Sequence, residues 1–239
     1  MLHRNHHIGH GKTSLLKRRH FTALALLAGS LGSSGLVLAQ YTARATAAPS
    51  AGKPGAPIIL VVGDSLSAEY GLKRGTGWVA LLELQLQEGK HPHQVVNASI
   101  SGDTTSGGRS RLPALLKQHQ PAIVIIELGG NDALRGLPLN MTRDNLATMA
   151  RQSRAAGAKV LLLGMEMPPN YGARYGQEFR ELYTTVAQEQ KTALLPFFLK
   201  GVGDLADPTR LFQSDRIHPN ERAQPIMLGN VWPELKKLL

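Results

Sequence analysis

The chain has 239 residues, no cysteine and a formal net charge of +10. Residues 1–47 carry six of the 27 Lys and Arg residues and no acid, which leaves 21 basic and 17 acidic residues over the rest of the chain. Because the excess basic charge lies mostly in this leader, we expect no nucleic-acid partner. The absence of cysteine excludes disulfide bonds.

The N-terminus is predicted to be a secretory signal peptide, residues 1–47. The basic stretch KTSLLKRRH precedes a largely apolar run and then small residues, with cleavage predicted after Ala39 or after Ala47. Arg18-Arg19 fits a twin-arginine signal as well as an ordinary basic n-region, so both export routes stay open. The interruption LGSSG argues against a stable membrane anchor. We expect a periplasmic or secreted monomer with at most transient lipid contact.

Residues 48–56 are rich in Pro, Gly and Ala and are expected to link the leader to one domain, residues 57–239. In that domain short apolar runs alternate with amphipathic stretches. The predicted strands are Ile58–Val62, Gln94–Asn97, Ile123–Leu128, Val160–Gly164 and Leu194–Phe197. The predicted helices are Trp78–Gln87, Gly108–Gln118, Arg143–Ala156, Gly176–Lys191 and Glu221 to the C-terminus, with a break or kink at Pro225 and Pro233. The alternation predicts an α/β fold with a central parallel sheet of about five strands between helical layers.

The first three predicted strands run into small polar residues, in GDSLS, NASISGDTT and ELGGND. In a parallel sheet the ligand site lies beyond the carboxyl ends of the strands. We therefore expect these three segments to meet at one edge of the sheet.

Ser65 in GDSLS is a candidate nucleophile. Gly63 allows a tight exit from the strand, and the residues after Ser65 can begin a helical turn whose positive end lies near the Ser65 N–H. The motif is not Gly-x-Ser-x-Gly, because Ser67 replaces the second glycine. A serine hydroxyl also needs a base, and without one Ser65 would be an ordinary turn or capping residue.

His218 in SDRIHPN is the candidate base. Asp215 stands three residues earlier, where its carboxylate can bond the imidazole Nδ1 and leave Nε2 free. The alternative is a plain turn before the last helix. His91, His93 and His119 lie in polar turns or at a helix end, where we expect surface positions.

Three groups are candidates to bind an oxyanion: the N–H groups of Ser65 and Gly102 and the side-chain amide of Asn131. Gly-Gly-Asn-Asp is also a good generic turn. Asp64 and Asp132 are expected in supporting roles, bracing the Ser65 loop and the Asn131 turn, because their charge would oppose an oxyanion beside them.

Asp103 is expected to cap the helix that follows it.

The four blocks GDSLS, ISGDTT, GGND and DRIHP, in this order, resemble the SGNH or GDSL hydrolase family. The matching residues are Ser65, Gly102, Asn131 and His218. SAEYG, PPNYGARY, LLPFF and HPNERAQP are similar to its periplasmic branch of arylesterases, acyl-CoA thioesterases and lysophospholipases. The resemblance implies a flavodoxin-like three-layer α/β/α fold and a Ser65–His218–Asp215 triad. It also implies hydrolysis of carboxylic esters and thioesters with no metal or cofactor.

Substrate contacts are expected from two segments, although each can also be an ordinary connector or packing element. The resemblance implies that MEMPPNYGARYG forms a mobile loop over the acyl chain, which suggests Pro168, Pro169 and Tyr171. Leu134 and Leu137 follow GGND and are candidates for an apolar acyl groove. Two alternatives stay open: a carbohydrate O-acetylesterase with the same mechanism, and a non-catalytic periplasmic protein that binds a small ligand.

Overall fold

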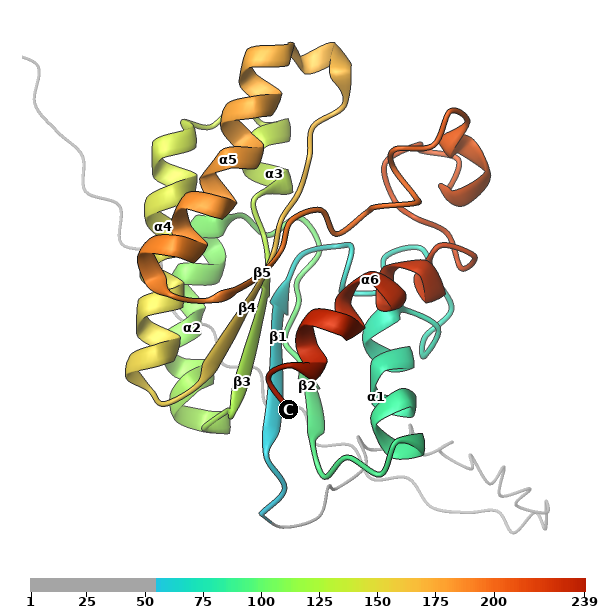
Figure 1. Cartoon of the computed structure of the whole chain (residues 1–239). Coiled ribbons are helices and arrows are strands. Elements are labelled where there is room, and N and C mark those ends of the chain that lie inside the picture. Colours follow the sequence, from blue (N-terminus) through green and yellow to red (C-terminus); the bar gives the residue numbers. More distant parts are fainter. Residues whose placement is uncertain (1–54) are drawn as a thin grey trace, which may run out of the picture. The chain divides into compact units, whose positions relative to one another are not determined.

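A computed structural model describes residues 55–239, so the predicted leader and nearly all of the predicted linker lie outside the described residues. The described strands form one parallel sheet in the order β2-β1-β3-β4-β5 (Figure 1). Their bounds are β1 Ile58–Gly63, β2 Gln94–Asn97, β3 Ile123–Glu127, β4 Lys159–Leu163 and β5 Ala193–Leu195. The predicted α/β class and the five-strand parallel sheet are confirmed.

Helices cover both faces of this sheet (Figure 1). The helices α1 (Trp78–Glu88) and α6 (Gln224–Lys236) lie on one side, and α2 (Thr105–His119), α4 (Leu139–Ala155) and α5 (Ala173–Gln190) lie on the other. Short helical segments are α3 (Gly130–Leu134), η1 (Pro169–Tyr171) and η2 (Pro208–Leu211). Because both faces are covered, β1 and β3 are built from consecutive apolar residues that are buried. Within residues 55–239, no helix combines the length and the apolar character that a membrane span requires.

Several helices begin earlier than the sequence pattern predicts. The helix α2 begins at Thr105 because the Thr104 side chain accepts a hydrogen bond from the Gly107 N–H, at 3.3 Å. The prediction that Asp103 caps this helix was therefore wrong. Its carboxylate instead forms an ion pair with Arg111, at 2.9 Å.

The two prolines near the C-terminus do not break the last helix. Pro225 lies in the first turn of α6, where a missing N–H costs nothing, so it marks the start of the helix. Pro233 lies inside α6, which continues to Lys236. The buried face of Met227, Val231 and Leu235 packs this last part of the helix into the core, and we infer that the packing outweighs the lost hydrogen bond.

The carboxyl ends of β1 and β3 are neighbours in the sheet, with Gly63 paired to Glu127. From β1 the chain passes to β2 on one side, and β3 then returns to the other side of β1. The connections that follow β1 and β3 therefore leave the sheet in opposite directions. The place where they part is a topological switch point, which is where α/β proteins bind ligands. GDSLS and GGND both start there.

Candidate active site

Ser65 lies in a tight helical turn that Asp64 organises. The Asp64 carbonyl accepts hydrogen bonds from the N–H groups of Ser67 (3.2 Å) and Ala68 (2.9 Å), and Asp64 Oδ1 accepts one from the Leu66 N–H (3.0 Å). Asp64 therefore caps the turn and leaves Ser65 half-buried at its start. Among the described residues, the Ser65 N–H has no hydrogen-bond acceptor.

Ser65, His218 and Asp215 form a continuous chain of side-chain contacts. His218 Nε2 lies 2.9 Å from Ser65 Oγ, and His218 Nδ1 lies 2.7 Å from Asp215 Oδ2. Asp215 Oδ1 also accepts the N–H groups of His218 (3.0 Å) and Ile217 (2.9 Å). The bond from the His218 N–H, with the His218 ring and the Ile217 N–H, lowers the pKa of Asp215 to about 2. The carboxylate is therefore charged at any ordinary pH and fixes the orientation of the imidazole.

Gln213 and Tyr70 join the loop of His218 to the loop of Ser65. Gln213 Nε2 donates to the carbonyl of Tyr70 (2.8 Å) and to that of Pro219 (3.2 Å), and the Gln213 N–H donates to the His218 carbonyl (2.8 Å). The Tyr70 ring packs against the imidazole with centroids 4.3 Å apart. Sequence reasoning missed Gln213, because a lone Gln at the end of an unpatterned stretch carries no signal.

Asn131 is bonded directly to the Ser65 turn. It lies in the first turn of α3, and its Nδ2 donates to Asp64 Oδ2 at 2.9 Å. An amide NH₂ has two hydrogens, so one remains for a ligand. Asp64 thus braces the Ser65 turn with one oxygen and orients Asn131 with the other.

Gly102 has a positive φ of 79°, a conformation that glycine adopts without strain. Its carbonyl accepts a hydrogen bond from Arg135 Nη2, at 2.8 Å, which ties the segment after β2 to the segment after α3. In the part of the chain that the structure describes, the Gly102 N–H is not used.

Asp132 is fully buried and its bonds go to α2 and α4 rather than to the Asn131 turn. Its carboxylate accepts the N–H (2.8 Å) and the hydroxyl (2.5 Å) of Thr105 and the hydroxyl of Thr142 (3.3 Å). The residue therefore secures the starts of two helices behind the site.

Glu127 is a buried acid behind the Ser65 turn that sequence reasoning missed. Its Oε2 accepts the N–H of Asp64 (3.2 Å) and the hydroxyl of Ser67 (2.8 Å). Burial, together with the Asp64 charge, raises the pKa of Glu127 well above its ordinary value, and burial raises that of Asp64 to about 6. The available signal was an acid directly after the apolar run IVII.

The predicted substrate residues lie on nearby segments of the same edge. Leu134 is exposed at the end of α3, Leu137 is half-buried, and Pro168 and Tyr171 are exposed. Pro169 begins η1, and its side chain lies outside the described residues. The Tyr175 hydroxyl donates to the Ala133 carbonyl (3.4 Å) and so holds the segment after β4 against α3.

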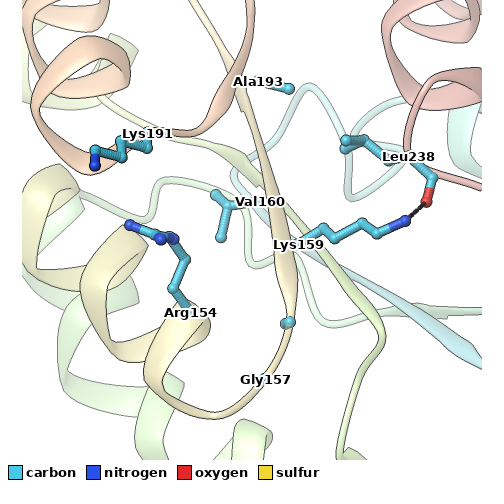
Figure 2. Close-up of a pocket in the computed structure, with 8 residues that line it drawn as sticks. Arg154, Gly157, Lys159, Val160, Lys191, Ala193 and Leu238 are labelled. Atoms are coloured by element: carbon cyan, nitrogen blue, oxygen red, sulfur yellow. Dashed lines mark hydrogen bonds between the residues drawn. The ribbon is translucent and has the colours of Figure 1, made fainter.

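A basic pocket lies at the opposite, amino end of the strands (Figure 2). It has a volume of about 250 Å³ and is lined by Arg154, Gly157, Ala158, Lys159, Val160, Lys191, Ala193 and Leu238. Arg154 donates to the last carbonyl of α5, that of Gln190, and Lys159 donates to the Leu238 carbonyl, each at 2.7 Å. Arg154 and Lys191 also complement the negative ends of α4 and α5. Across residues 55–239, His, Asp and Glu side chains nowhere form a group of three or more that could hold a metal ion.

Comparison with known proteins assigns the family. Residues 61–225 match the GDSL-like Lipase/Acylhydrolase family. The chain belongs to this family. It is 56% identical over 184 residues to Esterase TesA of Pseudomonas aeruginosa, covering 77% of this chain and 90% of that protein. It is 43% identical over 204 residues to Thioesterase 1/protease 1/lysophospholipase L1 of Escherichia coli K12, covering 85% of this chain and 91% of that protein.

Solved structures agree with this assignment to the GDSL-like family. A crystal structure of TesA matches with a TM-score of 0.73 and covers 76% of this chain and 99% of its own. The psychrotrophic esterase EstA from Pseudoalteromonas sp., inhibited by monoethylphosphonate, matches with a TM-score of 0.71 at 39% identity, covering 75% of this chain and 97% of its own. As a member of this family the chain is an enzyme, which rules out the alternative of a non-catalytic binding protein.

Proposed function

We propose that this chain is a serine hydrolase that cleaves carboxylic esters and thioesters of small acyl compounds. The observation that carries the proposal is the contact of Ser65 Oγ with His218 Nε2, at 2.9 Å, between residues 153 positions apart in the sequence. The contact lies at the switch point of the sheet, and the matched relatives are named esterase and thioesterase.

In the proposed reaction His218 accepts the Ser65 proton while Oγ attacks the acyl carbonyl carbon. Asp215 carries the negative charge that stabilises the resulting imidazolium. The protonated His218 then gives its proton to the departing alcohol or thiol, and an acyl-serine remains. Water, deprotonated by His218, attacks the acyl-serine, and the acid leaves as Ser65 recovers its proton.

Three donors are proposed to bind the oxyanion of each tetrahedral intermediate. They are the free N–H groups of Ser65 and Gly102 and the second Nδ2 hydrogen of Asn131. Their positions are fixed before substrate binds, by the Asp64 cap and by the Arg135 bond to Gly102, so little reorganisation is needed.

The acyl group of the substrate is proposed to be apolar. Exposed large apolar side chains stand on segments that follow the carboxyl ends of the strands or flank His218: Tyr70, Ile100, Leu134, Tyr171 and Ile217. Leu134, Leu137, Pro168, Pro169 and Tyr171 are proposed to contact the acyl chain. This apolar edge favours aryl and alkyl esters, acyl-CoA or lysophospholipid over an O-acetylated sugar.

The enzyme is proposed to act as a monomer in the periplasm or outside the cell. The support for the location is the predicted leader, residues 1–47, which lies outside the described residues.

Labelling with a fluorophosphonate tests the proposal, because only an activated serine reacts. Wild type should gain the mass of one phosphonyl group and lose hydrolysis of p-nitrophenyl acyl esters. Ser65→Ala should neither react nor hydrolyse, whereas Ser110→Ala, at an exposed serine of α2, should behave as wild type. Retained activity in Ser65→Ala would overturn the mechanism. Faster release of acetate from sugar esters than of longer acids from acyl esters would favour the O-acetylesterase.

A further inference from the structure

Glu127 lies directly behind the proposed nucleophile, and the reaction scheme does not use it. It is the last residue of β3, pairs in register with Gly63, and is 1% exposed. A Cβ on Gly63 would lie 2.7 Å from Glu127 Oε2 and 2.8 Å from Ser67 Oγ. Because Gly63 has no side chain, the Glu127 carboxyl and the Ser67 hydroxyl can contact each other in this space.

The Glu127 carboxyl holds both ends of the turn that contains Ser65. Oε2 accepts the Asp64 N–H (3.2 Å) at the start of the turn and the Ser67 hydroxyl (2.8 Å) two residues after Ser65. The Ser67 oxygen in turn accepts a bond from Trp78 Nε1 of α1, at 3.2 Å. The other carboxyl oxygen, Oε1, is buried and finds no donor among the described residues.

Glu127 and Asp64 are neighbours, because the Asp64 N–H donates to Glu127 Oε2. Both are buried, and two neighbouring carboxylates in such a place repel each other strongly. Burial and the Asp64 charge raise the pKa of Glu127 well above its ordinary value, and burial raises that of Asp64 to about 6. The two Asp64 oxygens accept hydrogen bonds from the Leu66 N–H and the Asn131 amide, which favour its charged form. Glu127 Oε1 has no donor among the described residues, so Glu127 is the acid of the pair that holds a proton.

We propose that Glu127 is a positioning residue: as a neutral carboxylic acid it fixes the Ser65 turn and, through Asp64, the Asn131 amide. The inference rests on the proposed function of this site. The connected bonds run from Glu127 to Asp64 and from Asp64 to Asn131, so they link the ends of β3 and β1 around the reacting atoms. Removing them displaces two oxyanion donors and leaves the substrate-facing side chains in place. The loss should appear in kcat and hardly in KM.

Two substitutions of similar size separate hydrogen bonding from packing. Glu127→Gln keeps an uncharged acceptor for the Asp64 N–H and the Ser67 hydroxyl, so its kcat should stay within about threefold of wild type. Glu127→Leu keeps the volume without either bond, and its kcat should fall about 10–100-fold with an unchanged KM. Glu88→Gln, an exposed acid on α1, serves as the control and should match wild type.

Infrared spectroscopy tests the proton directly and does not depend on the stability of Glu127→Leu. The spectrum of wild type minus that of Glu127→Gln, at a pH well above 6, should contain the carbonyl stretch of a protonated carboxyl. Absence of this band overturns the inference. So does a Glu127→Leu enzyme with wild-type kcat, or a Glu127→Gln enzyme as slow as Glu127→Leu. Failure of wild-type Ser65 to react with a fluorophosphonate would instead count against the proposed function.

Discussion

The chemistry proposed for Ser65 depends on which atoms neighbouring side chains present to it. Asp64, the residue before it, uses one carboxylate oxygen for the Leu66 N–H and the other for Asn131. Asp215 likewise uses one oxygen for two N–H groups of its own loop and the other for the His218 ring. In each case a single carboxylate fixes the backbone of a loop and the orientation of a functional side chain. Even conservative substitutions of Asp64 or Asp215 should therefore disturb both the loop and the side chain that it orients.

Asn131→Ala should lower kcat about 10²–10³-fold, because it removes one proposed oxyanion donor. Steady-state kinetics with a p-nitrophenyl acyl ester measure the effect, and far-UV circular dichroism checks the fold. Asn140→Ala, at an exposed residue early in α4, is the matched control. An Asn131→Ala enzyme within threefold of wild type would remove Asn131 from the proposed mechanism.

At the scale of elements, the site depends on how closely β1 and β3 end beside each other. Gly63 closes β1, and the side chains of Glu127 and Ser67 fill the space where its Cβ would be. The glycine of GDSLS is thus needed for close packing between two strand ends.

Gly63→Ala should lower the free energy of unfolding by about 1–3 kcal/mol, since the added methyl group overpacks a buried junction. It should also lower kcat, because Ser67 and Glu127 must move. Gly176→Ala is the control: apart from its chain neighbours and the backbone of α5 itself, nothing lies within 4 Å of the new methyl group. Alanine at this position of α5 should stabilise the protein by about 0.5–1 kcal/mol. Urea unfolding measures the free energy of unfolding of both variants. An equal change in Gly63→Ala and Gly176→Ala would contradict the packing argument.

The loop of His218 is held to the loop of Ser65 largely by Gln213. Gln213→Ala removes the bonds to the Tyr70 and Pro219 carbonyls, so the imidazole should be less well placed and kcat should fall about tenfold. The same kinetic assay with Gln188→Ala, at an exposed glutamine of α5, should show no change. If kcat were unaffected in Gln213→Ala, the Tyr70 ring and the Phe212–Pro219 bridge would suffice to hold the loop.

At the scale of the whole molecule, burying Asp64 lowers the stability of the folded protein at neutral pH. Its pKa rises from 3.8 to about 6 on folding, so the folded protein binds this proton more tightly than the unfolded chain does. The contribution of Asp64 to the free energy of unfolding is therefore highest below about pH 4. It falls as the pH rises through about 6, by about 3 kcal/mol in all.

Asp64→Asn should remove this dependence. The stability of wild type relative to Asp64→Asn should decrease by about 3 kcal/mol between about pH 4 and about pH 8, as measured by urea unfolding at several pH values. Ser110→Ala, which changes no titratable group, should follow wild type throughout. A constant difference between wild type and Asp64→Asn would show that Asp64 titrates at its ordinary pKa.

The sequence predicted local features well and long-range contacts poorly. The strands are apolar runs with polar ends, so the sheet and the convergence of GDSLS and GGND could be predicted. The contacts of Gln213 with Tyr70 and of Glu127 with Ser67 join residues 143 and 60 positions apart. No local pattern signals such pairs, because each forms only when the sheet order brings two loops together. Asp103 was predicted to cap α2, but its carboxylate pairs with Arg111 and the Thr104 side chain caps the helix.

The helices α2, α4, α5 and α6 run opposite to the strands, so their C-terminal ends gather at the edge away from Ser65, where Figure 2 shows Lys159 and Lys191. Six of the eight lysines among residues 55–239 lie on segments at this edge: Lys90, Lys117, Lys159, Lys191, Lys236 and Lys237. A support that couples to primary amines would therefore attach the enzyme mainly by this end. Most immobilised molecules would present Ser65 to the surrounding solution, and the attached preparation should keep most of its specific activity.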